Sequence, residues 1–168
     1  AGDIYLVHNG IIENYKELKA TLSDHTFTSE TDSEVLAALI DSFYTTEATL
    51  ESAVIQALQL VEGTYGIAVI STREPDQVIV ARMGSPLIIG VGEDELVIAS
   101  DASALIGHTT NAIYLNDGEM AICTRDGVKL EDLEAHPLTA RVEQIEADMS
   151  AIQKQGYEHF LLKEIMEQ

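Results

Sequence analysis

The pattern of apolar and polar positions changes along the chain near Gly63, from a helical period to an extended one. Before Gly63, apolar residues recur at intervals of three and four, which predicts amphipathic helices over residues 14–22, 31–43 and 49–61. After Gly63, short apolar runs alternate with turn-forming clusters, which indicates strands paired as antiparallel hairpins in one long sheet. The predicted strands cover residues 65–71, 77–83, 87–91, 96–100, 112–115 and 119–124.

The first apolar run, residues 4–7, predicts a short strand buried on both faces. Asn9 and Gly10 follow it, just before the first predicted helix. Asn-Gly is a common turn pair, so the local pattern alone favours an ordinary turn. The alternative is a functional site, because the Asn9 carboxamide and the unshielded Gly10 N–H can both donate to an oxygen that becomes negative.

The second predicted helix has its own start signals. Residues 26–28 alternate like a short strand, and Thr31 with Glu34 fits a capping box. Asp32 lies between them, where a carboxylate either stabilises the free N–H groups of the helix or faces a ligand. Capping is the reading that local evidence favours, and the functional alternative is recognition of a substrate ammonium group.

The later part of the chain is less uniform. Asp101 is expected to cap a short helix that runs to Leu105, and residues 125–127 mark a hairpin turn. Residues 130–148 show only weak alternation and predict no element, whereas residues 156–168 predict a final helix. Because the sequence has no internal repeat or low-complexity linker, we expect a single domain over residues 1–168.

Composition narrows the possible partners. The chain has 168 residues, with nine basic and 29 acidic side chains and a formal net charge of −20. Such a charge repels phosphate backbones and anionic lipids, which argues against nucleic acid and membrane surfaces as partners. No apolar run approaches the ~20 residues that span a bilayer, and the start of the chain does not resemble a signal peptide. We therefore expect a cytoplasmic location.

The residue types that carry chemistry are sparse. The sequence has one cysteine, Cys123, inside an apolar run, which favours a packed core thiol over a nucleophile. The five histidines, at positions 8, 25, 108, 136 and 159, show no metal-ligand spacing. We expect neither a metal site nor a cofactor.

Several strings, in this order, resemble the glutaminase domains of the glucosamine-6-phosphate synthase family, the isomerising glutamine–fructose-6-phosphate aminotransferases. They span nearly the whole chain: VHNGIIEN at 7–14, SETDSE at 29–34, GTYG at 63–66, ARMGSPL at 81–87, ASD at 99–101 and KEIMEQ at 163–168.

The resemblance implies an α+β fold, the αββα sandwich of antiparallel sheets found in N-terminal-nucleophile hydrolases. In this family a cysteine at the mature N-terminus attacks the glutamine side-chain amide, with its own α-amino group as base. The ammonia passes to a sugar isomerase domain, where fructose 6-phosphate becomes glucosamine 6-phosphate in amino-sugar biosynthesis. By position, Asn9 and Gly10 match the oxyanion-hole pair, and Asp32 matches the acid that holds the glutamine α-amino group.

The chain departs from the family pattern at its start, which reads Ala1-Gly2-Asp3 instead of Cys. We expect a partial glutamine amidotransferase type 2 domain, truncated at its N-terminus, without the nucleophile and without the sugar isomerase domain. Cys123 cannot replace the nucleophile, because the mechanism needs a free α-amino group on the same residue. The isolated chain is therefore expected to be inactive, and to expose apolar sheet surface and an unpaired edge.

Three readings of the parent protein remain open at this point. The first is the synthase itself, which we expect to be a homo-oligomer. The second is another type 2 glutamine amidotransferase with a different acceptor domain, and the third is a non-catalytic domain that binds an amino acid.

Overall fold

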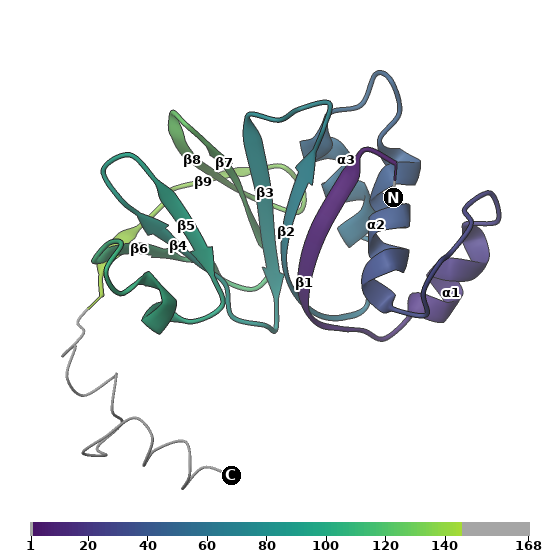
Figure 1. The fold of residues 1–168 in the computed structure, drawn as a ribbon, viewed down its shortest axis with the longest axis horizontal. Coiled ribbons are helices and arrows are strands. Elements are labelled where there is room, and N and C mark those ends of the chain that lie inside the picture. Colours follow the sequence, from purple (N-terminus) through teal and green to yellow (C-terminus); the bar gives the residue numbers. More distant parts are fainter. Residues whose placement is uncertain (1, 146–168) are drawn as a thin grey trace, which may run out of the picture.

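The computed structural model of the chain describes residues 2–145, which form three α-helices and two antiparallel sheets (Figure 1). The first sheet has the strand order β1-β2-β3-β7-β8-β9 and the second has the order β10-β6-β4-β5. The elements are β1 (Ile4–Ile12), α1 (Tyr15–Thr21), α2 (Asp32–Phe43), α3 (Leu50–Leu58), β2 (Gly63–Ser71), β3 (Gln77–Met83), β4 (Ile88–Val91), β5 (Leu96–Ala99), the 3₁₀ helix η1 (Ala102–Leu105), β6 (Asn111–Tyr114), β7 (Glu119–Thr124), β8 (Gly127–Asp132), β9 (Pro137–Leu138) and β10 (Val142–Gln144).

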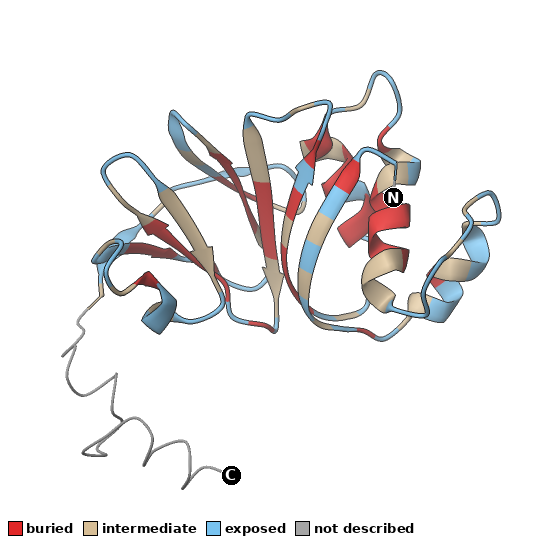
Figure 2. Ribbon diagram, in the orientation of Figure 1, coloured by how far each residue is buried: buried red, intermediate tan, exposed pale blue. Residues whose placement is uncertain are grey.

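The helices and the second sheet cover opposite faces of the first sheet. Ile79 of β3 packs in one hydrophobic cluster with residues of α2 and α3, whereas its neighbour Val80 packs with Ile89 and Ile113 of the second sheet. Successive side chains of a strand point to opposite faces, so β3 is buried on both sides. Figure 2 shows the buried positions gathered in α2 and in the middle of β3. The helix-sheet-sheet layering agrees with the expected sandwich.

Strand β1 differs from its prediction in length and in burial. It continues through Asn9 and Gly10 to Ile12, and all nine of its residues pair with β2, so the predicted turn is absent. The prediction that the run is buried on both faces is also wrong, because Tyr5 and Val7 are 59% and 70% exposed. Since β1 is the edge strand and no described residues cover its second face, only the face toward the helices is buried.

The segment before α2 also differs from its prediction. Residues 26–28 form no strand, and the chain from Leu22 to Thr31 is irregular. Half of the predicted capping box is present, because the Thr31 hydroxyl accepts a hydrogen bond from the Glu34 backbone N–H at 3.3 Å. The Glu34 carboxylate does not return to Thr31, but accepts from the backbone N–H groups of Thr28 and Ser29 at 2.8 and 2.6 Å. Glu34 therefore holds the irregular segment against the start of α2.

The other helices follow the predicted pattern with two changes. Thr49 caps α3, accepting from the Ser52 N–H, and this helix ends at Leu58, before the predicted end at residue 61. Asn14 precedes α1 without a side-chain capping bond, and its carboxamide instead binds the Leu60 carbonyl and the Glu62 N–H. These two bonds hold the end of β1 beside the start of β2.

Two connections cross between the sheets at one end of the sandwich. The chain passes from β3 to β4 through Gly84, and from β6 to β7 through Asp117, so neither connection is a hairpin turn within one sheet. Arg82 joins them: its Nη1 donates to the Leu115 carbonyl at 2.7 Å, and its Nε lies 3.1 Å from Asp117 Oδ1 in an ion pair. The same Asp117 oxygen accepts from the Gly84 N–H at 2.9 Å. We call these four residues the crossover clasp.

The remaining elements were predicted in part. Asp101 caps η1, accepting from the Ser103 N–H at 2.7 Å, and residues 125–127 turn between β7 and β8 as expected. Strands β8, β9 and β10 lie mostly in the stretch for which no element was predicted. The helix predicted over residues 156–168 lies outside the described residues.

Candidate functional site

Asp32 lies against the free edge of β1, beside Gly10. The Ile12 backbone N–H donates to Asp32 Oδ2 at 2.9 Å, and His8 Nδ1 is 3.8 Å from Asp32 Oδ1. Because residues 8 and 12 flank Gly10 on the strand, these two contacts place the carboxylate alongside it. The structure therefore brings Asp32 next to Gly10, although these residues lie in a helix and a strand and not in a turn.

Gly10 has a backbone conformation that only glycine adopts readily. Its φ is +138°, and a Cβ added to it would stand 2.2 Å from the Thr64 carbonyl oxygen of the paired strand. Any side chain would have to push β2 away from β1 at this point. N–H groups alternate in direction along a paired strand, so the Gly10 N–H faces the same free edge as the Ile12 N–H, which donates to Asp32.

Asn9 points to the other face of β1, the one that carries the exposed Tyr5 and Val7. Within residues 2–145 its carboxamide makes no hydrogen bond. Its partner across the ladder is Gly66, where an added Cβ would lie 3.3 Å from the Pro86 carbonyl oxygen. Asn9 is thus an exposed hydrogen-bond donor next to the residue that packs against the connection from β3 to β4.

Asp32 keeps one quarter of its side chain exposed and is the first residue of α2. Its Oδ2 is bound to β1, whereas Oδ1 accepts, from residues 2–145, a single long hydrogen bond, that of the Ser33 hydroxyl at 3.4 Å, with His8 Nδ1 farther away at 3.8 Å. A partly exposed carboxylate with a weakly bonded oxygen can accept hydrogen bonds from an ammonium group. The local signals of helix capping and ligand binding are the same, which is why the sequence could not separate them.

His8 is a residue of this site that the sequence reasoning missed. Its side chain is 1% exposed, and Nδ1 lies 3.1 Å from the Ser33 hydroxyl oxygen. The only signal was its place in β1, two residues before Gly10 and on the face of the apolar Leu6. The alternation of faces along a strand places His8 on the buried face, but only if the strand is known to continue past His8.

Two buried groups, one beside Gly10 and one at the far end of the sheet, stay protonated at neutral pH. Burial, together with the negative charge of Asp117, raises the pKa of Tyr65, the residue that pairs with Gly10, to about 12. Burial likewise raises the pKa of the Cys123 thiol to about 12, so this cysteine is the core residue that its sequence context predicted and not a nucleophile.

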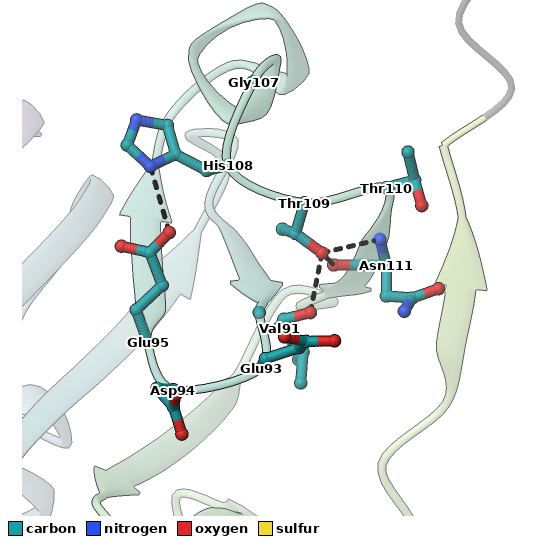
Figure 3. A pocket seen from close by; sticks show the side chains of 10 residues that line it. Val91, Glu93, Asp94, Glu95, Gly107, His108, Thr109, Thr110 and Asn111 are labelled. Atoms are coloured by element: carbon teal, nitrogen blue, oxygen red, sulfur yellow. Dashed lines mark hydrogen bonds and ion pairs between the residues drawn. The ribbon is translucent and has the colours of Figure 1, made fainter.

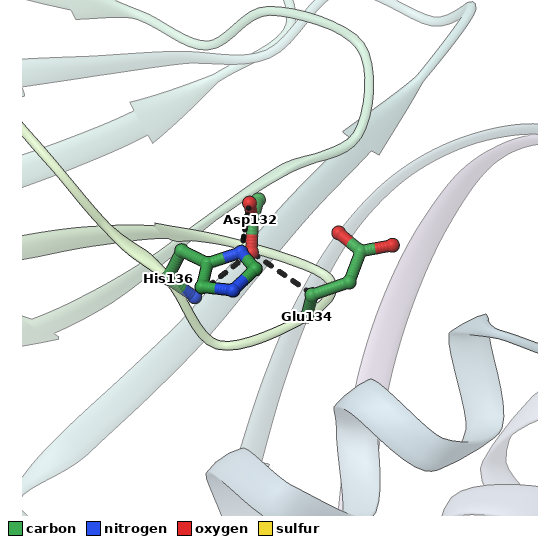
Figure 4. A group of neighbouring side chains, drawn as sticks. All are labelled: Asp132, Glu134 and His136. Carbon is green, nitrogen blue, oxygen red and sulfur yellow. Dashed lines mark hydrogen bonds and ion pairs between the residues drawn. The ribbon is translucent and has the colours of Figure 1, made fainter.

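Two other groupings lie apart from this edge. Asp132, Glu134 and His136 approach one another after β8 (Figure 4), but Asp132 already accepts hydrogen bonds from the backbone N–H groups of Glu134 and His136, which makes it a turn residue. A hollow of about 910 Å³ lies between the β4–β5 turn and residues 107–111, where Glu95 pairs with His108 at 3.1 Å (Figure 3).

None of the helices in residues 2–145 has the length and apolar character that crossing a bilayer requires.

Comparison with known proteins gives the same family as the sequence motifs. A family described as a glutamine amidotransferase domain matches residues 1–107. The glutamine–fructose-6-phosphate aminotransferase (isomerizing) of Chlorobaculum tepidum is 51% identical over all of this chain, and that of Methanothermobacter thermautotrophicus is 45% identical over all of it. The chain spans 28% and 29% of the length of these two relatives.

Solved structures give the same fold. The glutamine phosphoribosylpyrophosphate amidotransferase of B. subtilis, complexed with ADP and GMP, superposes with a TM-score of 0.68 at 30% identity, covering 81% of this chain and 30% of that one. A class-II glutamine aminotransferase domain protein from Silicibacter pomeroyi, at 20% identity and a TM-score of 0.57, shares the fold. The fold is the α+β sandwich of the N-terminal-nucleophile hydrolases, as expected. The chain belongs to the glutamine amidotransferase domain family.

Proposed function

We propose that this chain is the glutamine-hydrolysing part of an isomerising glutamine–fructose-6-phosphate aminotransferase. In that role it releases ammonia from L-glutamine for a sugar isomerase domain, which converts fructose 6-phosphate to glucosamine 6-phosphate. Residues 1–168 then form one partial amidotransferase domain of a cytoplasmic, homo-oligomeric parent protein. The identity of 42–51% to relatives with the name glutamine–fructose-6-phosphate aminotransferase supports the proposed activity.

The proposed chemistry assigns one role to each residue at the edge of β1. A cysteine thiolate of the parent protein attacks the carboxamide carbon of glutamine, and the carbonyl oxygen becomes negative. The Asn9 carboxamide and the Gly10 N–H donate hydrogen bonds to that oxygen, and the amide nitrogen leaves as ammonia once it is protonated. Water then hydrolyses the thioester to glutamate. Cys123 takes no part because its thiol is buried and protonated.

Asp32 pairs with the glutamine α-ammonium group in this proposal. The observation that carries it is the 2.9 Å bond from the Ile12 N–H to Asp32 Oδ2, which fixes an acidic group beside the proposed oxyanion donors. A site that pairs a charged group rejects amides without that charge. The carboxylate therefore accounts for a preference for glutamine over simple amides.

A second candidate function is that of another glutamine amidotransferase of the same fold. The B. subtilis enzyme is similar in structure, but its identity of 30% is well below the 51% to the Chlorobaculum aminotransferase. A non-catalytic amino-acid-binding domain would need Asp32 but not the donors at Asn9 and Gly10. Kinetics of variants at the two kinds of position separate these readings.

The test is glutamine hydrolysis by the full-length protein with Asp32→Asn. We expect the KM for glutamine to rise about 10- to 100-fold, since a hydrogen bond to a charged group is worth about 1.5–3 kcal/mol. The kcat should change little, because this interaction is the same in the ground state and the transition state. Glu30→Gln is the matched control, since Glu30 is exposed, carries the same charge and precedes Asp32 by two residues.

In the same assay, Asn9→Ala should lower kcat by roughly 10²–10³, the usual loss for one oxyanion donor. An unchanged KM in Asp32→Asn would contradict the assignment of Asp32. Full kcat in Asn9→Ala, or glutamine binding without turnover in the parent protein, would favour the non-catalytic reading.

A further inference from the structure

We propose that His8 is a positioning residue for Asp32, acting through the Ser33 hydroxyl. It would set the affinity for the glutamine α-ammonium group without touching glutamine. The inference rests on the proposed function and adds a residue to it. Its basis is a chain of polar atoms that runs from the buried face of β1 to the first turn of α2.

If both contacts of the Ser33 hydroxyl are hydrogen bonds, the donor and the acceptor of each are fixed. The Ser33 hydroxyl lies 3.4 Å from Asp32 Oδ1 and 3.1 Å from His8 Nδ1. A hydroxyl has one proton, and a carboxylate can only accept, so Ser33 donates to Asp32. His8 Nδ1 must then carry a proton and donate to the Ser33 oxygen. In this arrangement His8 orients Ser33, and Ser33 orients Asp32.

The burial of His8 argues against a role in stability alone. The other side chains on this face of β1 are apolar, namely those of Ile4, Leu6 and Ile12. His8 Nε2 is buried and has no hydrogen-bond partner within the described residues. An unpaired buried nitrogen is unfavourable, and an apolar side chain of similar size would avoid its cost. The histidine is therefore explained by its Nδ1 contact.

The expected consequence of losing this contact follows from the two oxygens of Asp32. Oδ2 stays bound to the Ile12 N–H, so the carboxylate remains at the strand. The Ser33 hydroxyl becomes free to rotate away from Oδ1, which lets the carboxylate turn about its bond to Ile12. Binding of the α-ammonium group weakens, whereas Asn9 and Gly10 stay in the β1–β2 ladder and kcat is unchanged.

The experiment compares His8→Leu with His8→Asn in glutamine hydrolysis by the full-length protein. Asparagine can place an N–H donor where histidine has Nδ1, but it has no Nε2, whereas leucine has no donor. We expect His8→Leu to raise the KM for glutamine about 3- to 10-fold, the size typical of one lost uncharged hydrogen bond, with kcat unchanged. His8→Asn should keep a KM close to that of the parent, and His8→Leu should melt no lower than the parent.

Ser33→Ala tests the same chain from its middle. We expect the same rise in KM, and the double variant His8→Leu/Ser33→Ala should be no worse than either single one, because both changes break one path. If His8→Leu fails to fold, Ser33→Ala together with His8→Asn carries the test.

Two results would overturn the inference. One is a fall in kcat with unchanged KM in His8→Leu, which would mean that His8 supports the strand and not Asp32. The other is additive effects of the two single changes. Asp32→Asn is measured in parallel: if it leaves KM unchanged, the proposed function fails, whereas a raised KM there with a normal KM in His8→Leu and Ser33→Ala defeats this inference alone.

Discussion

Gly10 shows how a single residue ties the site to the sheet. Its positive φ and its contact with Thr64 are separate constraints, because one concerns the backbone torsion and the other the space beside it. Gly127 in the β7–β8 turn has nearly the same φ, +136°, but nothing lies within 4 Å of an added Cβ. The two glycines therefore separate torsional strain from close approach.

Alanine substitution at both positions makes this difference measurable. We expect Gly127→Ala to lower the free energy of unfolding by about 1–2 kcal/mol, the cost of a left-handed conformation. Gly10→Ala should cost at least about 3 kcal/mol, because β2 must also move. Denaturant unfolding of both variants checks the order. Equal losses would show that the approach of Thr64 is relieved without cost.

At this scale the sequence could predict which residues matter but not how they are used. The local pattern favours a turn at Asn9 and Gly10, because turns and close backbone approaches both select glycine, and only the family resemblance pointed to an oxyanion hole. The deciding contact is with Thr64, far along the chain, and no local pattern contains it. His8 was missed for the same reason, since its partner Ser33 belongs to another element.

Helix α2 is the element that carries Asp32, and the segment before it is held by one side chain. The Glu34 carboxylate accepts hydrogen bonds from the backbone and hydroxyl groups of Thr28 and Ser29. These bonds, that from the Ser29 hydroxyl foremost and that from the Thr28 backbone N–H next, lower the pKa of Glu34 from the usual 4.5 to about 2. The sequence predicts a capping box between Thr31 and Glu34. The irregular path of residues 22–31 instead decides which groups the Glu34 carboxylate binds.

This depressed pKa predicts a pH dependence of stability. A carboxyl group whose pKa is lower in the folded state stabilises the fold above its unfolded pKa, and loses that contribution as the pH falls through the folded one. We expect the parent chain to be more stable than Glu34→Gln at neutral pH, with the difference shrinking between pH 4.5 and about 2. Urea unfolding at a series of pH values measures it. Glu17→Gln on α1 is the control, and a constant difference across this range would refute the prediction.

The six-stranded sheet exposes apolar side chains at its β1 edge. Tyr5, Val7 and Ile11 of β1 and Ile70 of β2 form an apolar edge face, each between 47% and 70% exposed. Exposed apolar strands at a sheet edge favour association with other chains. The formal charge of −20 opposes association between identical copies, and dissolved salt screens that repulsion.

The isolated chain should therefore associate more strongly as the salt concentration rises. Sedimentation velocity at low and high salt measures this. Val7→Lys should reduce the association, whereas Val142→Lys, at an exposed valine on β10 of the other sheet, should not. A monomer at every salt concentration would contradict the expectation that the edge face is adhesive.

The overall architecture was predictable only as far as periodicity reaches. The helices and most strands of the chain follow from their spacing, since each pattern is local. The strand order, and the fact that the chain changes sheets after β3, β6 and β9, depend on contacts between distant residues. The family resemblance supplied the sandwich that the pattern alone could not.

The crossover clasp has a mechanical consequence for the site. Arg82 and Asp117 hold the two sheets together where the chain passes between them. The Gly84–Pro86 connection at this point packs against Gly66, the ladder partner of Asn9. At residues 75–78, 91–96 and 123–127 the sheets instead border a hollow of about 820 Å³. The two sheets are thus joined at one end of the sandwich and border a hollow at the other. We expect any separation of the sheets to begin at the hollow, which leaves the surroundings of Asn9 in place.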